Sequence, residues 1–234
     1  MPQVISNELI SAPEDKMYLM RVAGDFPARM GQCYMLRAWE TYPTLSRPIS
    51  VHDKGDGYIS FMYRQISEGT EILVSLKSGD EITLNGPYGN GFPEKPEGKV
   101  ALVGGGMGIA PLYLAAKSLP KPDIYLGFRE RVIFGDKYQA AAGKFISRVG
   151  GTILYDIKVD EYDTIFACGP LGMEKALADK AAGSKAKLYL SLEKHMACGM
   201  GACLVCTCFT KGGNKKVCKD GPVFLASEVI FDDL

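Results

Sequence analysis

The chain has 234 residues, enough for about two domains and a small additional segment. Its 27 lysines and arginines equal its 27 aspartates and glutamates, so a basic surface for nucleic acid or an anionic membrane is not expected. No apolar run approaches the roughly 18 residues of a membrane span, and the N-terminus lacks the pattern of a signal peptide. We therefore expect a cytoplasmic protein with neither nucleic acid nor a membrane as a partner.

The first part of the chain consists of short apolar runs separated by turns. Runs that regular, each too short for a helix, favour an antiparallel barrel or sandwich. Residues 92–98 contain two prolines and are predicted to be a linker, which gives a first domain of residues 1–95. Four runs are predicted to be strands: 17–22, 32–37, 58–63 and 81–84.

From residue 100 the pattern changes to alternating strands and helices. Such alternation indicates a parallel sheet with helices on both faces, which we assign to a second domain of residues 96–190. The predicted strands are 100–103, 124–128, 152–155 and 164–167. The predicted helices are 109–119, 138–149 and 171–182.

A glycine-rich run, Gly104 to Pro111, follows the first strand of this second region. Glycines let the backbone approach a diphosphate, and the next helix offers free N–H groups and a positive dipole end. Gly106, Gly108 and Pro111 satisfy G-x-G-x-x-P, whereas Ile109 replaces the third glycine of the G-x-G-x-x-G fingerprint. The run alone fits either a dinucleotide site or a purely structural turn.

Four cysteines near the C-terminus have the spacing Cys198-x4-Cys203-x2-Cys206, followed twelve positions later by Cys218. Three thiolates on one loop and a fourth on a neighbouring segment are what a [2Fe–2S] cluster requires. A zinc site would more often show two Cys-x2-Cys pairs, and disulfides are not expected in a reducing compartment. We predict that residues 191–234 form a small cluster-binding segment.

Two other cysteines are not expected to be ligands. Cys208 lies two positions after Cys206 and could replace it, but the x4-x2 spacing favours Cys206. Cys33 lies in an apolar run and is predicted to be a small core residue.

Two further motifs complete a recognisable set. Arg47-Pro48-Ile49-Ser50 lies in the first region, and Cys168-Gly169-Pro170 follows the last predicted strand of the second. With the glycine-rich run, they resemble the ferredoxin–NADP reductase superfamily. The resemblance implies a flavin on the barrel and a nicotinamide dinucleotide on the α/β domain, with Arg47 at the flavin diphosphate and Ser50 near the isoalloxazine. Cys168 would border the nicotinamide, although a surface ion pair for Arg47 and simple packing for Cys168 are the alternatives.

The order of the three modules is similar to that of the electron-transfer subunits of class 1B dihydroorotate dehydrogenases, over essentially the whole chain. Local agreement is close at residues 86–92, 196–203 and 217–224. The resemblance implies FAD, a [2Fe–2S] cluster and NAD as cofactors. It also implies that the flavin and dinucleotide contacts include Arg47, Pro48, Ile49, Ser50, Tyr63, Arg64, Gln65, Ile66, Gly69, Thr70, Gly104, Gly106, Gly108, Pro111, Cys168, Gly169 and Pro170.

The resemblance further implies a partner and a pathway. The partner would be an FMN-containing catalytic subunit that interconverts dihydroorotate and orotate in pyrimidine biosynthesis, in a heterotetramer of two of each chain. Two alternatives stay open: an electron-input subunit of a hydrogenase or transhydrogenase, and a cofactor-sensing protein without enzymatic activity. The segment Arg129-Glu130-Arg131 fits NAD or NADP, and the resemblance favours NAD. Lys194-His195 stands where the family pattern leads us to expect a single arginine.

Overall fold

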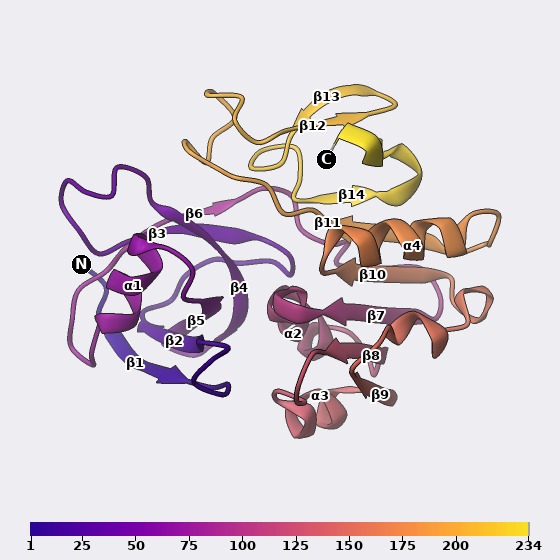
Figure 1. Cartoon of the computed structure of the whole chain (residues 1–234), viewed down its shortest axis with the longest axis horizontal. Helices are drawn as coiled ribbons and strands as arrows, with labels where there is room; N and C mark the ends of the chain where they lie inside the picture. The colour runs from indigo at the N-terminus through magenta and orange to yellow at the C-terminus, as the bar shows by residue number, and fades with distance from the viewer. Residues whose placement is uncertain (234) are drawn as a thin grey trace.

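The computed structural model describes residues 1–233 and contains a barrel, a mostly parallel sheet and a C-terminal segment (Figure 1). The barrel strands follow the order β1-β2-β5-β4-β3-β6, and all their pairings are antiparallel. A bridge between Gln3 and Glu81 closes the barrel from β1 to β6. The strands are β1 (Val4–Leu9), β2 (Met17–Ala23), β3 (Cys33–Arg37), β4 (Arg47–Gly55), β5 (Tyr58–Arg64) and β6 (Thr83–Tyr88).

One helix, α1 (Glu68–Ser75), connects β5 to β6. Its last carbonyls are satisfied by the Asn7 side chain, whose Nδ2 donates to Leu73 O at 2.8 Å. Because free carbonyls at a helix end need partners, this contact fixes α1 to β1. The first turn of α1 faces the candidate site.

The second sheet has the order β14-β11-β10-β7-β8-β9, and every pairing is parallel except that of β14. The strand order therefore reverses between β7 and β10, which is where open α/β sheets bind ligands. The strands are β7 (Val100–Gly105), β8 (Asp123–Phe128), β9 (Lys144–Val149), β10 (Thr164–Cys168), β11 (Lys187–Ser191) and β14 (Val223–Leu225).

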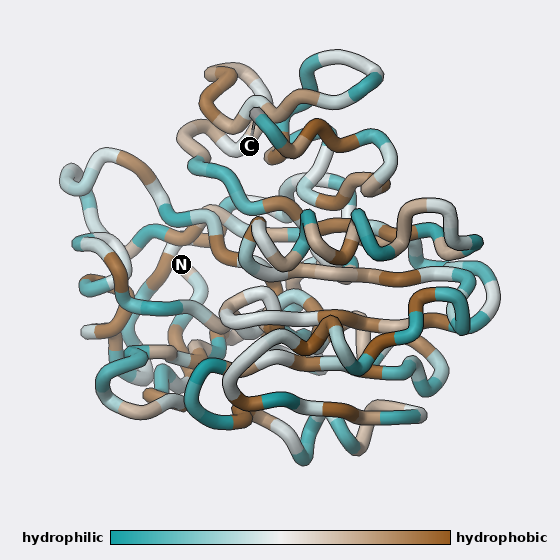
Figure 2. Tube along the Cα trace, turned by 45° about the vertical axis from the view of Figure 1, so that its right-hand side comes forward, coloured by the Kyte–Doolittle hydropathy of each residue, from teal (hydrophilic) through white to brown (hydrophobic). Residues whose placement is uncertain are grey.

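Helices cover both faces of this sheet. Helices α2 (Ile109–Ser118) and α3 (Gly135–Ala141) pack on the face that carries Leu102 and Phe166, in a core continuous with the barrel. Helix α4 (Leu171–Ala181) packs on the opposite face, in a second core that reaches the C-terminal segment. Figure 2 shows hydrophobic stretches along the stacked strands and hydrophilic stretches in the outer loops.

The C-terminal segment forms a hairpin, β12 (Thr207–Thr210) and β13 (Gly213–Lys216), before β14 joins the large sheet beside β11. The predicted fold class is confirmed: an antiparallel barrel, a parallel α/β sheet and a small C-terminal segment. The predicted limits at 95/96 and 190/191 stay predictions. Among residues 1–233, no helix is both long and apolar enough to cross a membrane.

Two predicted elements were wrong. Residues 138–149 are the end of α3 followed by β9, which pairs in parallel with β8 along its whole length. Residues 152–155 contain a single 3-10 turn, Ile153–Tyr155, because β9 already occupies that edge of the sheet. A short run of apolar residues fits a helix or a strand equally well. Whether it forms a strand depends on a neighbouring strand that the local sequence does not reveal. The predictions also did not include α1 or the strands β1, β4, β11, β12, β13 and β14.

Candidate functional site

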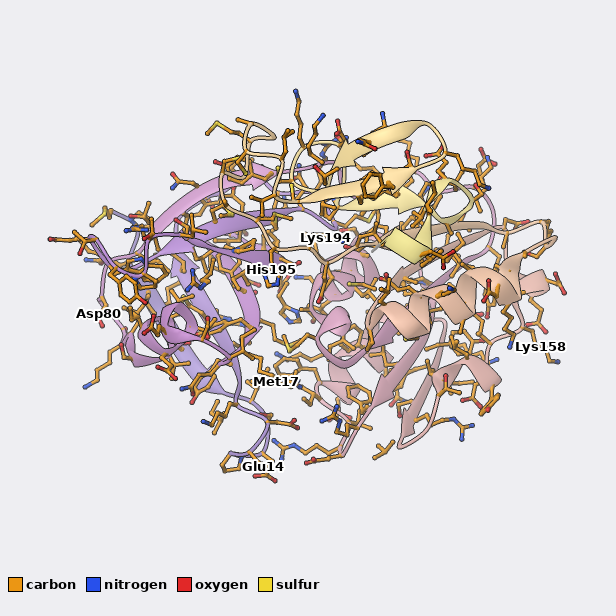
Figure 3. The ribbon with its side chains drawn as sticks, turned by 45° about the horizontal axis from the view of Figure 1, so that its top comes forward. Glu14, Met17, Asp80, Lys158, Lys194 and His195 are labelled. Carbon is orange, nitrogen blue, oxygen red and sulfur yellow. The ribbon has the colours of Figure 1, made fainter. Side chains whose placement is uncertain are left out.

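A cavity of about 1000 Å³, called the large cavity below, lies between the barrel, the start of α2 and the segment that leads into the cysteine loop. This volume is at the upper end of the range for small-molecule and cofactor sites. Figure 3 shows Lys194 and His195 at the junction of the barrel with the α/β part. The lining includes Arg47, Pro48, Ile49, Ser50, Met62, Arg64, Ile66, Thr70, Met107, Ala110, Pro111, Cys168, Lys194, His195 and Val205.

The Arg47 guanidinium lies against the first turn of α1. A Cβ at Gly69 would lie 2.5 Å from Arg47 Nε, so a larger residue there would displace the guanidinium from this position. The Thr70 hydroxyl accepts the N–H groups of Ile66 and Ser67 at 2.8 and 2.9 Å, so it stabilises the turn itself. A guanidinium beside a helix N-terminus is a strong diphosphate-binding arrangement, and the residues present therefore fit FAD.

Two residues predicted to line the flavin are not among the residues that line the large cavity. Tyr63 points to the face of β5 opposite Met62 and Arg64, and its hydroxyl donates to Asn7 Oδ1 at 2.9 Å. The backbone N–H of Gln65 donates to the Lys16 carbonyl at 3.0 Å. Their position in the structure indicates that they support α1 and β2, and flavin contact stays a prediction for them.

A second cavity, of about 270 Å³, opens at the carboxyl ends of β7, β8 and β10. Gly106 and Gly108 of the glycine-rich run line it with Gly169 and Pro170, whereas Pro111 and Cys168 line the large cavity. A Cβ at Gly108 would lie 2.1 Å from Cys168 O, so glycine lets the two motifs touch at the sheet's switch point. The lining includes Gly105, Gly106, Gly108, Arg129, Glu130, Arg131, Gly169 and Pro170, with Asp15, Met17 and Arg64 from the barrel side. This arrangement fits a nicotinamide dinucleotide.

Cys168 is buried where the two cavities meet. Its Sγ donates to the Ser191 carbonyl at 3.5 Å, and burial raises the pKa of this thiol well above its usual value. Cys168 is therefore a neutral thiol that packs at the end of β10. Glu193 was missed by sequence reasoning, although its side chain lines both of these cavities and a third beside α4.

Glu174, on the first turn of α4, is a second residue that the sequence did not indicate. Its side chain is 2% exposed, and its Oε1 accepts the N–H of Gly169 at 3.3 Å. Burial raises the pKa of Glu174 to about 9, so the carboxyl is neutral at pH 7 behind the Cys168–Pro170 loop.

Glu174→Gln is expected to raise the melting temperature more at pH 8 than at pH 5. The folded-state pKa lies above the unfolded value of 4.5, so stability is lost as pH rises through this interval, at up to about 1.4 kcal/mol per pH unit. Glutamine keeps the acceptor oxygen and does not titrate. Thermal unfolding at both pH values measures the effect, with exposed Glu14→Gln as the control. An advantage of the variant that is equal at pH 5 and pH 8 would contradict the assignment.

The cysteine loop places its four predicted ligands as two pairs. Cys198 Sγ accepts the N–H of Cys203 at 3.5 Å, and Cys206 Sγ accepts the N–H of Cys218 at 3.4 Å. Gly199 and Gly201 have φ of 73° and 84°, as expected for a loop that turns N–H groups toward sulfur. The N–H of Cys203, then its thiol and the N–H groups of Met200 and Ala202, lower the pKa of the Cys198 thiol to about 6.

The pairs do not close into a ligand shell: among residues 1–233, no three His, Cys, Asp or Glu side chains meet the geometry of a metal site. The donor chemistry of four thiols fits an iron–sulfur cluster. Cys208 is fully buried on β12, in the second core. Cys33 is buried as predicted, and it also lines the large cavity. Burial, and to a lesser extent the nearby Cys206 thiol, raises the pKa of Cys33 to about 12.

The cysteine loop is attached to the barrel as well as to the sheet. Asn90, just after β6, donates its backbone N–H to the Gly221 carbonyl at 2.5 Å. A Cβ at Gly199 would lie 3.0 Å from the Tyr88 ring, so the loop packs directly on β6. These contacts hold the cysteine loop against the barrel, and Val205 of this loop lines the large cavity.

Known proteins share both the sequence and the architecture. Residues 193–230 match the iron-sulfur cluster binding domain of dihydroorotate dehydrogenase B. The chain is 46% identical over 232 residues to the "Dihydroorotate dehydrogenase B (NAD(+)), electron transfer subunit" of Clostridium acetobutylicum, covering 94% of each chain. It is 41% identical to the protein of the same name from Clostridium perfringens, covering 92% of each.

Among solved structures, an NADH-dependent reduced ferredoxin–NADP oxidoreductase aligns with a TM-score of 0.88 at 27% identity, over all of this chain and 91% of that one. A ferredoxin NADP⁺ reductase from Neisseria gonorrhoeae with bound FAD and NADP aligns with a TM-score of 0.64 at 15% identity, over 82% of this chain and 98% of that one, and shows the fold. The level of identity and the coverage of the curated relatives establish that this chain belongs to the family of dihydroorotate dehydrogenase B electron transfer subunits.

Proposed function

We propose that this chain transfers electrons between NAD and the FMN-containing catalytic subunit of a dihydroorotate dehydrogenase, in pyrimidine biosynthesis in the cytoplasm. The observation that carries the proposal is the continuity of the three candidate sites. Arg64 and Met107 line both the large cavity and the cavity at the switch point. At its other side, the large cavity is lined by Cys33 and Val205, beside the cysteine loop.

The chain's own residues bind and orient the cofactors. Arg47 and the first turn of α1 hold the flavin diphosphate, and the glycine-rich turn before α2 receives that of the nicotinamide. Cys198, Cys203, Cys206 and Cys218 hold the cluster. When bound, a flavin exchanges two electrons with a nicotinamide and single electrons with an iron–sulfur cluster, so the protein supplies orientation and excludes water.

Co-expression with the catalytic subunit tests the proposal. The purified complex, a heterotetramer of two of each chain, is expected to reduce NAD⁺ with dihydroorotate, whereas the catalytic subunit alone is not. Cys218→Ser in this chain is expected to abolish NAD⁺ reduction and leave the reaction of the catalytic subunit with an artificial acceptor intact. Dihydroorotate-dependent NAD⁺ reduction by the catalytic subunit alone would contradict the proposal.

A second candidate function is a transhydrogenase-type role with NADPH as a substrate. It is favoured by the solved structure that is 27% identical to this chain, an NADH-dependent reduced ferredoxin–NADP oxidoreductase. We expect NADH to be preferred over NADPH, with Glu130 accepting from a ribose hydroxyl beside Arg129 and Arg131. The measurement is kcat/KM for each nucleotide with an artificial acceptor. Glu130→Gln is expected to narrow the preference, whereas an NADPH preference would favour the transhydrogenase-type role.

A further inference from the structure

The strand β4 contributes to two different parts of the molecule. Its first residues, Arg47 to Ser50, line the large cavity. Its second half packs against α2, which begins directly after the glycine-rich turn at Gly106–Gly108. The packing of β4 against α2 therefore joins the flavin side of the proposed site to the nicotinamide side.

His52 makes the first polar contact between them. Its side chain is 2% exposed, and Nδ1 lies 3.0 Å from the Ala110 carbonyl in the first turn of α2. Because a carbonyl only accepts, Nδ1 carries the proton and donates it. The ring stacks on Tyr113 of the same helix, with centroids 4.8 Å apart and planes 16° from parallel.

The second polar contact lies two helical turns further along α2. Lys117 Nζ pairs with Asp53 Oδ1 at 2.6 Å, and the Tyr58 hydroxyl donates to Asp53 Oδ2 at 2.9 Å. Ala110 and Lys117 are seven residues apart, so they face the same side of the helix. Attachment at two points along one helix fixes its rotation as well as its position.

A third contact holds the same turn from helix α3. The Tyr138 hydroxyl of α3 donates to the Ile109 carbonyl at 2.6 Å, and Tyr138 is fully buried. Phe134, which precedes α3 with a φ of 55°, contacts the His52 ring at a centroid distance of 5.7 Å. Buried side chains thus engage two successive carbonyls in the turn that follows the glycine-rich run.

The buried imidazole of His52 is not explained by packing alone. Burying a polar ring costs free energy unless its hydrogen bond is made, and an aromatic hydrocarbon ring would pack in the same volume without that cost. Unlike a hydrocarbon ring, the imidazole makes a directional hydrogen bond. This bond to the Ala110 carbonyl can form only when α2 lies in one position along β4.

We propose that His52, together with the Asp53–Lys117 pair, is a positioning element that sets the register of the glycine-rich turn against the flavin strand β4. The proposal rests on the proposed function, since it concerns how the flavin and nicotinamide sites are held together. A shift of α2 by a fraction of a turn would displace the nicotinamide from the flavin, and misplacements of about 1 Å can cost orders of magnitude in rate.

The test measures flavin reduction by NADH in the holoprotein by stopped flow. His52→Phe keeps the stacked ring and removes the donor, and it is expected to lower the limiting reduction rate about tenfold. The FAD and iron content should stay within about 20% of that of the unmodified protein, and His52→Asn, which restores a donor near the Nδ1 position, should recover most of the rate. A purely structural role would change cofactor content or melting temperature and leave the limiting rate per bound FAD unchanged.

If His52→Phe loses FAD, Lys117→Met decides the question, because its side chain is 39% exposed, the His52–Tyr113 ring stack is unchanged, and Asp53 keeps the hydrogen bond from the Tyr58 hydroxyl. It is expected to lower the limiting rate about threefold. Lys175→Met is the matched control. It breaks the exposed ion pair between Lys175 on α4 and Asp232, and the limiting rate is expected to stay unchanged.

Limiting rates for His52→Phe or Lys117→Met equal to that of the unmodified holoprotein would overturn the positioning role. Failure of NADH and NADPH to reduce the flavin of the unmodified holoprotein would instead overturn the proposed function.

Discussion

Replacing any one of Cys198, Cys203, Cys206 and Cys218 with serine is expected to remove the iron–sulfur cluster. The unmodified holoprotein should contain about two irons and two sulfides per chain, and each variant close to none. Serine is a hard oxygen ligand with a high pKa, so it binds iron in place of a thiolate poorly. Iron and sulfide assays with the visible absorption spectrum measure the loss, and transfer to the catalytic subunit should stop with it.

The control for these variants is Cys208→Ala. Cys208 is fully buried on β12, so alanine removes its sulfur without placing a new polar group in the second core. We expect full cluster content and a modest fall in melting temperature. Retention of the cluster in Cys218→Ser, or its loss in Cys208→Ala, would show that the ligand set is assigned incorrectly.

Arg47→Ala is expected to weaken FAD binding about 10- to 100-fold. The guanidinium lies against the first turn of α1 and supplies a charge-assisted contact to a diphosphate, a contact typically contributing about 1.5–3 kcal/mol. Titration of the apoprotein with FAD, followed by quenching of flavin fluorescence, measures the change. FMN lacks the second phosphate, so its weaker binding should depend much less on this residue.

Two variants separate charge from geometry at this position. Arg47→Lys keeps the positive charge and loses the planar fork, so we expect an intermediate loss. Arg21→Ala removes an exposed arginine that stacks on Tyr58 on another face of the barrel, and FAD affinity should not change. Release of FMN alone on denaturation, or an Arg47→Ala affinity equal to that of the unmodified protein, would contradict the FAD assignment.

Much of the molecule could be predicted from local sequence. Three motifs could be interpreted without knowing the fold: the cysteine spacing, the glycine-rich run and Cys168-Gly169-Pro170. Each motif lies within a short stretch of chain, and the backbone geometry of that stretch suits the ligand. The alternation of strands and helices indicated the parallel sheet because hydrophobic periodicity is a local property. The structure brings the glycine-rich turn and the Cys168 loop together at the switch point, a contact that the sequence did not predict.

Only the tertiary structure decided which chain segments become neighbours. Residues 144–149 form a strand because β8 offers a free edge, and Tyr63 faces away from the cavity because its place on β5 sets its side. His52 gave no signal in the sequence, since its role depends on Ala110, 58 residues away. Backbone turns and ligand spacings are specified within a few residues, whereas strand pairing, burial and long-range hydrogen bonds depend on the whole packed chain.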